Sequence, residues 1–110
     1  MANIYQNAKI SLTTTADTVL YTVPSNSRAI DKSILVAEDA AGSATVKVTL
    51  VNSSSTIFVI DNLITLAAYE NKQVISEPLI MEESEVLKVQ AASGAVDVVA
   101  SVLEINREDK

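Results

Sequence analysis

The 110-residue chain contains no cysteine, no histidine and no tryptophan. The absence of cysteine excludes a disulfide framework, and without cysteine and histidine the usual thiolate and imidazole metal ligands are missing. Neither a Ser-His nor a Cys-His nucleophile pair can form, and the usual proton shuttle near neutral pH is absent. We therefore expect a protein that is not an enzyme, with no catalytic, cofactor or metal site.

Cationic residues are also scarce. Eight Lys and Arg against 14 Asp and Glu leave a net charge of -6, and the basic residues are scattered singly along the chain. No cationic stripe can neutralise a row of phosphates, so we expect neither nucleic acid nor an anionic membrane as a partner. Residues 1–6 lack the pattern of a signal peptide, and no run of about 18 apolar residues predicts a membrane span.

The abundant residues are those that favour β-strands. Val, Ile and Thr number 14, 10 and 9, which is 33 of the 110 residues, and their branched side chains suit a pleated sheet better than a helix. The only aromatic residues are Tyr5, Tyr21, Phe58 and Tyr69. We therefore expect an all-β protein whose core is mostly aliphatic.

Alternation of apolar and polar residues locates the strands. It predicts strands at residues 8–12, 18–23, 29–38, 45–50, 56–60, 86–91 and 95–105. Lys32 interrupts the apolar face of the third of these, which indicates a bulge. Asp61-Asn62 is predicted to end a strand, and residues 63–69 fit either a strand or one helical turn. In residues 74–81, Pro78 predicts an edge strand or a strand that ends before the proline.

These strands predict one domain, residues 1–110, folded as an antiparallel β-sandwich or jelly roll of about eight strands. A short N-terminal arm, Ala2 to Lys9, and a charged tail from Arg107 to Lys110 are expected to lie free of the sheets. The alternation also predicts a core, which comprises Ile10, Leu12, Ile30, Ile34, Val46, Val48, Leu50, Phe58, Leu87, Val89, Val99 and Leu103.

Three kinds of residue are candidates for a site. Glu82, Glu83 and Glu85 form the densest acidic group, but they lack the ligand spacing of a calcium loop, so a solvated turn is the favoured interpretation. Tyr21 precedes a Val-Pro turn, where its ring is expected to pack on the sandwich and its hydroxyl to reach a backbone group. Arg28 is open to two interpretations, an ion pair within the domain or one across a subunit boundary.

Several segments together resemble small structural proteins of tailed bacteriophage particles, of the kind found in marine phages. The similar segments cover nearly the whole chain and are residues 2–9, 20–24, 28–34, 46–50, 77–80 and 85–89. The resemblance implies a viral, non-enzymatic structural protein of the virion that is assembled in the host cytoplasm. It carries over no functional residue, because the similar segments are strand and turn patterns.

The resemblance favours a capsid decoration (cement) protein, because the chain has no shaft-like repeat of the kind that a fibre needs. It implies a homo-oligomer, with a trimer favoured, that binds the major capsid protein or another virion protein. The interface candidates are Asn3, Ile4, Tyr5, Tyr21 and Arg28. Two alternatives remain: a neck, tail or fibre component, and a small carbohydrate-binding or adhesion module, which would need the three tyrosines to cluster in one groove.

Overall fold

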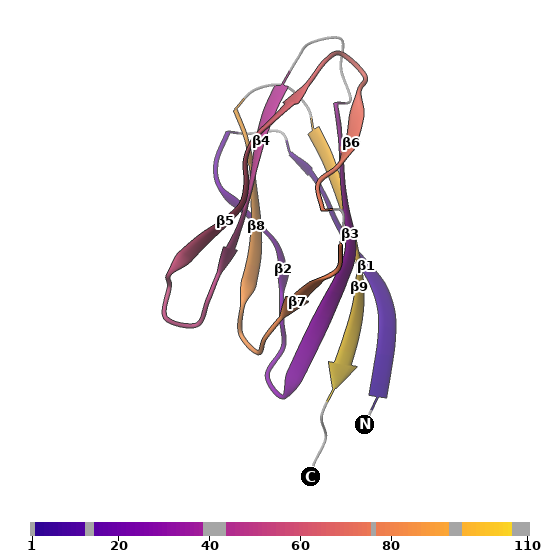
Figure 1. The fold of residues 1–110 in the computed structure, drawn as a ribbon, viewed down its shortest axis with the longest axis vertical. Coiled ribbons are helices and arrows are strands. Elements are labelled where there is room, and N and C mark those ends of the chain that lie inside the picture. The colour runs from indigo at the N-terminus through magenta and orange to yellow at the C-terminus, as the bar shows by residue number, and fades with distance from the viewer. Residues whose placement is uncertain (1, 13–14, 39–43, 76, 93–95, 107–110) are drawn as a thin grey trace.

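The computed structural model describes residues 2–12, 15–38, 44–75, 77–92 and 96–106, which form two antiparallel sheets packed face to face (Figure 1). The predicted all-β sandwich is therefore confirmed. The strands are β1 (Ala2–Leu12), β2 (Thr18–Thr22), β3 (Ser27–Glu38), β4 (Ala44–Val51), β5 (Ile57–Leu66), β6 (Asn71–Gln73), β7 (Leu79–Met81), β8 (Val86–Ala91) and β9 (Val96–Asn106). No helix that could span a membrane occurs in these ranges.

The two sheets are built from strands distant in sequence. Sheet A has the order β1-β9-β3-β6, and β7 also pairs with β3. Sheet B has the order β2-β8-β4-β5. In sheet A the central strand β9 pairs along its whole length with both neighbours, from Ala2↔Asn106 to Leu12↔Val96 on one side and from Ser27↔Asn106 to Glu38↔Val96 on the other.

The core lies between the sheets and is aliphatic, as predicted. Of the predicted core residues, Leu12, Ile34, Val46, Val48, Leu87 and Val89 are buried, and Ile10 and Leu50 pack partly buried against them. The interior also contains Leu20, Val23, Leu66 and Met81 and the inward residues of β9, which are Val96, Val98, Ala100 and Val102.

Four predicted core residues lie elsewhere, for three reasons. Val99 and Leu103 are on the outward phase of β9, and a one-residue error in phase moves a strand's whole apolar set to the other face. The predicted bulge in β3 is present between Asp31 and Ser33, and it leaves Ile30 facing outward while Ile34 faces inward. Phe58 is 51% exposed, because its part of β5 extends beyond the core.

Three strand boundaries differ from the predictions. Asp61-Asn62 does not end a strand: β5 continues to Leu66, and two register shifts against β4 accommodate the extra residues. Of the two alternatives for residues 74–81 the edge strand is found, but it begins only after Pro78, at Leu79, and among the described strands it pairs with β3 alone. Residues 2–9 are not a free arm, since they form most of β1 and pair with β9. The predicted tail, residues 107–110, lies outside the described residues.

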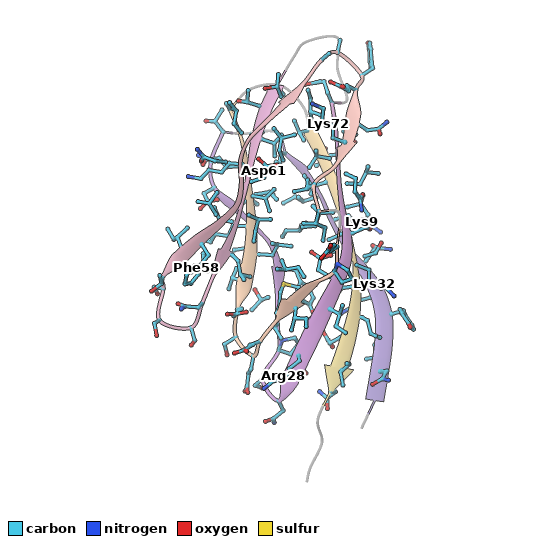
Figure 2. All side chains as sticks on the ribbon, viewed as in Figure 1. Lys9, Arg28, Lys32, Phe58, Asp61 and Lys72 are labelled. Atoms are coloured by element: carbon cyan, nitrogen blue, oxygen red, sulfur yellow. The ribbon has the colours of Figure 1, made fainter. Side chains whose placement is uncertain are left out.

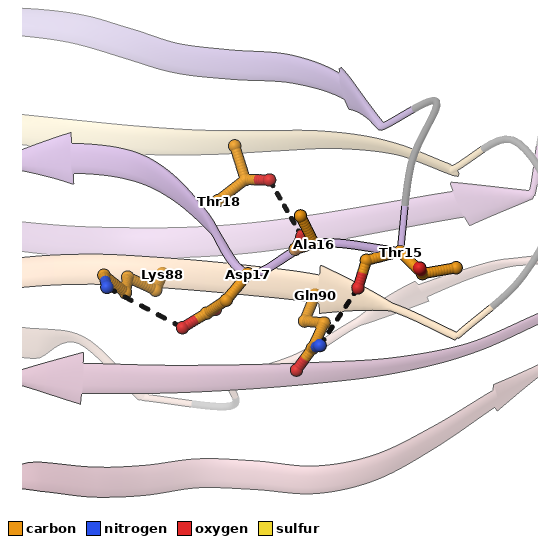
Figure 3. A network of polar contacts seen from close by, with 6 residues as sticks. All are labelled: Thr15, Ala16, Asp17, Thr18, Lys88 and Gln90. Carbon is orange, nitrogen blue, oxygen red and sulfur yellow. Dashed lines mark hydrogen bonds and ion pairs between the residues drawn. The ribbon is translucent and has the colours of Figure 1, made fainter.

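Polar contacts hold the segment before β2 along β8 (Figure 3). Gln90 Nε2 donates to the backbone oxygen of Thr15 at 3.0 Å, and Lys88 Nζ lies 3.7 Å from Asp17 Oδ2. Thr18 Oγ1 donates to the backbone oxygen of Ala16, also at 3.0 Å. These contacts fix the entry to β2, which is an edge strand of sheet B.

Candidate functional site

The first candidate surface is the β4–β5 hairpin, residues 50–60, which we call the apolar hairpin. Its turn is closed by Asn52, whose Oδ1 accepts hydrogen bonds from the backbone N–H groups of Ser54 at 3.0 Å and Thr56 at 2.9 Å. Ser55 adopts a φ of 65°, and its backbone N–H donates to the backbone carbonyl oxygen of Asn52 at 2.9 Å. The turn is therefore a defined structure that projects the first part of β5 beyond the core, as Figure 1 shows at its lower left.

The strand leaving this turn is apolar on both faces. Ile57, Phe58 and Val59 are 62%, 51% and 52% exposed, and successive residues of a strand point to opposite faces. Among the described strands β5 pairs only with β4, so its other edge has no neighbour. The sequence from Val48 to Ile60 contains no charged residue. The apolar hairpin therefore lacks the charges and prolines that usually protect an exposed strand edge.

The second candidate surface is the outer face of sheet A. Strand register places four apolar side chains in one row across it: Tyr5 opposite Leu103, Leu103 opposite Ile30, and Ile30 opposite Ile80. Tyr5 and Ile80, at the two ends of the row, are 73% and 64% exposed. An apolar row of this kind on a solvent-facing sheet is typical of a contact surface.

Cations surround this row, and we call the whole surface the cationic face. Arg28, Lys32 and Lys9 are exposed residues of β3 and β1. Lys9 and Lys32 lie on the outer side of sheet A (Figure 2), and the pairing of Arg28 with the outward residue Ile105 places Arg28 on the same face. None of the three forms an ion pair with a described residue. Asp97, half-buried, is the acidic residue that register places among the outward side chains of β1, β9 and β3. A positive surface has thus formed on a chain whose net charge is -6.

The predicted interface residues divide between this face and the interior. Asn3, Tyr5 and Arg28 all lie on the cationic face, where Asn3 and Arg28 flank Ile105 in the row next to that of Tyr5. Ile4 is on the opposite phase of β1 and is 46% exposed. Tyr21 points inward. The strand register brings together residues that the sequence keeps up to a hundred positions apart, so only a prediction of strand pairing could have grouped them.

The Tyr21 hydroxyl links the two sheets. It donates to Glu104 Oε2 at 2.6 Å, and Gln6 Nε2 donates to the same oxygen at 3.0 Å. Tyr21 belongs to sheet B, and Gln6 and Glu104 to sheet A. Burial and, after it, the hydrogen bond to the carboxylate raise the pKa of Tyr21 above its usual value. The predicted packing role holds, but the prediction of a backbone partner was wrong.

A buried carboxyl group lies near the contact between Tyr21 and Glu104. Asp31, on β3, is 0% exposed, and neither of its carboxylate oxygens has a hydrogen bond of standard geometry. Burial raises the pKa of Asp31 to about 7, although the backbone N–H of Ser33 acts in the opposite direction. The carboxyl is therefore held largely protonated by the interior below neutral pH.

The acidic turn between β7 and β8 has a structural role. Glu83 Oε2 accepts from the backbone N–H of Asn26 at 2.9 Å, and Glu85 Oε1 accepts from that of Glu82 at 2.8 Å. The backbone N–H of Val23 donates to the backbone carbonyl oxygen of Glu85 at 2.9 Å. The Glu83 carboxylate and the backbone bond of Val23 join this turn to the turn after β2, and the Glu85 carboxylate closes its own turn. No group of three or more acidic side chains placed to hold a metal occurs in the described ranges.

The three tyrosines do not form a groove. Tyr5 lies on the cationic face, Tyr21 points into the sandwich, and Tyr69 lies in the turn between β5 and β6 with a φ of 59°. A carbohydrate-binding module would use such rings as a shared stacking platform. Their dispersal disfavours that alternative.

Sequence comparison gives no relatives: no family model and no curated protein matches the chain. Solved structures with a similar fold include a protein of Bacillus endospore appendages, which are disulfide-linked pili, at 8% identity and a TM-score of 0.55; the match covers 94% of this chain and 88% of that one. A chain of infectious bursal disease virus, Gx strain, matches at 12% identity and a TM-score of 0.53.

A chain of the T13 particle of the same virus matches at 9% identity and a TM-score of 0.51. The viral matches cover 100% and 93% of this chain but 35% of each viral chain, so this protein spans about a third of their length. These similarities establish a shared β-sandwich fold, one that also occurs in a viral particle and in pili.

Proposed function

We propose that this protein is a non-enzymatic structural subunit of a phage particle, a capsid decoration protein that binds the shell as a homo-oligomer. The observation that carries the proposal is the apolar hairpin. Three consecutive large apolar residues, each more than half exposed on an unpaired edge, would promote uncontrolled association unless a partner covers them. A subunit made to assemble has that partner.

The charge pattern favours a second copy as the partner of the apolar hairpin. Two chains that each carry a net charge of -6 repel each other, and the repulsion is smallest where they meet through uncharged segments. Val48 to Ile60 is such a segment, and Ala2 to Ala8, on the edge strand β1, is another. The two edges belong to different sheets, so the hairpin of one copy can meet β1 of the next.

A contact between two different surfaces is heterologous, and repeated contacts of that kind close a ring when the rotation permits. We therefore favour a trimer, which also matches the threefold positions of an icosahedral shell. A hairpin that meets its own twofold copy would give a dimer instead. The similar spore-appendage protein belongs to disulfide-linked pili, but this chain contains no cysteine, so disulfides cannot join its copies.

Light scattering on the purified protein tests the self-association. The wild type is expected to be a trimer at micromolar concentration, and the double variant Phe58→Lys/Val59→Lys is expected to be a monomer with an unchanged far-ultraviolet spectrum. Leu35→Lys/Val99→Lys is the matched control, because it places two positive charges on neighbouring exposed apolar residues of the other sheet. A monomeric wild type, or a hairpin double variant that still assembles, would contradict the proposal.

The absence of cysteine makes cross-linking a direct test of the contact. In a heterologous ring, disulfides form when Val59→Cys and Asn3→Cys subunits are mixed, and neither variant alone gives a covalent dimer. A covalent dimer of Val59→Cys alone would indicate a twofold contact. The location on the particle is tested separately by a density map of the intact virion, in which decoration subunits occupy regular positions on the shell.

A further inference from the structure

We propose that the cationic face binds an acidic protein surface with an apolar centre, and that this face attaches the oligomer to the shell. The inference deepens the proposed function and depends on it for the class of partner, another structural protein of the same particle. It concerns the outer face of sheet A, whereas self-association was assigned to two strand edges, the apolar hairpin of sheet B and the edge of β1.

Charge argues against a second copy as the twofold partner of this face. In a twofold contact the same surface patch of each copy faces the other copy. Arg28, Lys32 and Lys9 of one copy would therefore meet the same cations of the other. None of the three has an ion pair with a described residue, and Asp97 is the one acidic side chain among the outward residues of β1, β9 and β3, so little negative charge on this face offsets the repulsion. Complementarity therefore requires carboxylates on the partner.

The apolar row decides between acidic protein and other polyanions. A phosphate backbone or a lipid headgroup layer would use the cations but would leave the row of Tyr5, Leu103, Ile30 and Ile80 without a matching apolar surface. Three separate cations, spread over about 20 Å of strand, are also few for a phosphate-binding site. A protein interface commonly has the arrangement seen here, an apolar centre within a polar rim.

A hollow beside Tyr5 offers an anchor point. Its volume is about 300 Å³, and its lining residues are Tyr5, Gln6, Asn7, Lys32, Ser101 and Val102. The size suits one partner side chain, and Lys32 at its wall suits a carboxylate. The Tyr5 end of the apolar row therefore has both a shape and a charge for a partner to recognise.

The binding experiment uses defined polymers as probes. Poly-glutamate supplies charge alone, and a glutamate–tyrosine copolymer of equal length supplies charge with apolar groups. The copolymer is expected to bind the wild type more tightly than poly-glutamate, and Arg28→Glu/Lys32→Glu is expected to weaken its binding about tenfold or more. Lys47→Glu is the control, because it reverses one charge on the outer face of sheet B.

Each other outcome overturns the inference. Preferential binding of single-stranded DNA or of phosphatidylserine vesicles would replace the proposed partner class. Equal copolymer binding by the wild type and the face variant, or no binding at all, would show that the face is not the docking surface. Loss of self-association in the face variant would make a second copy its occupant. The hairpin variant Phe58→Lys/Val59→Lys is expected to lose assembly while keeping copolymer binding, which separates failure of this inference from failure of the proposed function.

Discussion

The apolar hairpin and the cationic face differ in charge, in the sheet that carries them and in what lies beneath them. The hairpin is uncharged and extends past the core, so both of its faces are exposed. The cationic face covers the core directly, and its strands have buried residues on their other side. An uncharged edge can meet a copy of itself without charge repulsion, whereas a group of cations that has no ion pair with a described residue favours a partner that carries carboxylates.

This difference shows how a small acidic β-sandwich can bind two different partners through two separate surfaces. Apolar burial has no preferred partner, so the hairpin alone would be promiscuous. Charge discriminates, because like charges placed together in an interface cost free energy. The few cations of the chain are therefore most informative where several lie on one face, and in the described ranges that face is the outer side of sheet A.

The largest expected effect is a loss of stability caused by a substitution in the core between the two sheets. Leu87 is 0% exposed on β8, opposite Leu50 of β4 and Tyr21 of β2. Leu87→Ala removes packed methyl groups and leaves a cavity, which is expected to lower the free energy of unfolding by about 2 to 4 kcal/mol. Urea denaturation measures the change. A loss below about 0.5 kcal/mol would show that the position does not support the core.

A smaller effect on the free energy of unfolding is expected from pH, through the buried carboxyl of Asp31 on β3. The pKa of Asp31 is close to its ordinary value of 3.8 in the unfolded chain and is raised by burial to about 7 in the folded protein. Between these values the folded state holds a proton that the unfolded state has lost, so this group makes the free energy of unfolding fall as pH rises from about 4 to about 7. Below pH 4 the loss is absent, and above pH 7 it is complete.

Asp31→Asn removes the titration. The variant is expected to be more stable than the wild type above pH 7 by about 1 to 3 kcal/mol, since an unpaired buried amide still carries some desolvation cost. Thermal unfolding of both proteins at pH 5 and pH 8 measures the difference in stability. The other carboxylates are the same in both proteins, so their contributions cancel in this difference. Parallel stability curves over this pH range would show that Asp31 is not held protonated by the fold.

The next effect tests how rigidly the two surfaces are joined. Tyr21→Phe removes the hydrogen bond between β2 and Glu104 of β9 but keeps the ring and the contact of Gln6 with Glu104. The free energy of unfolding is expected to fall by about 1 to 2 kcal/mol, because a partly buried carboxylate loses one donor. Oligomer size and copolymer binding should remain as in the wild type. A change in either would show that the link between the sheets positions a surface.

How far the sequence predicts these features depends on local neighbours. In β4, Thr and Lys separate Val46, Val48 and Leu50, so the buried phase is unambiguous, and the prediction was correct. In β9, Val98 and Val99 are adjacent, and only the outward Asp97 and Ser101 indicate that Val98 is the buried one. Phe58 was assigned to the core because it is apolar, but its exposure depends on where the opposite sheet ends, which no local pattern records.

The same limit applies to the candidate sites. Asn3, Tyr5 and Arg28 were named one by one from the sequence, but their common face follows from the pairing of β1 and β3 with β9. Lys32 indicated the bulge after Asp31, but the sequence did not predict that Ile30 faces outward. The pattern does not show whether the residues before the bulge or those after it have their apolar side chains directed inward. Long-range register therefore accounts for most of what the sequence left open.

The smallest expected effect is local to the apolar hairpin. Ser55 has a φ of 65°, a conformation that costs a residue with a Cβ about 1 kcal/mol and that glycine adopts freely. Because glycine also gains freedom in the unfolded chain, Ser55→Gly is expected to raise the free energy of unfolding by only about 0.5 kcal/mol. Its backbone N–H can still donate to Asn52, so the turn is kept. If the hairpin is the contact between copies, the variant should also tighten self-association slightly while leaving copolymer binding unchanged, and light scattering over a dilution series measures this. Weaker self-association in a protein of unchanged or higher stability would mean that the Ser55 side chain itself contacts the neighbouring copy.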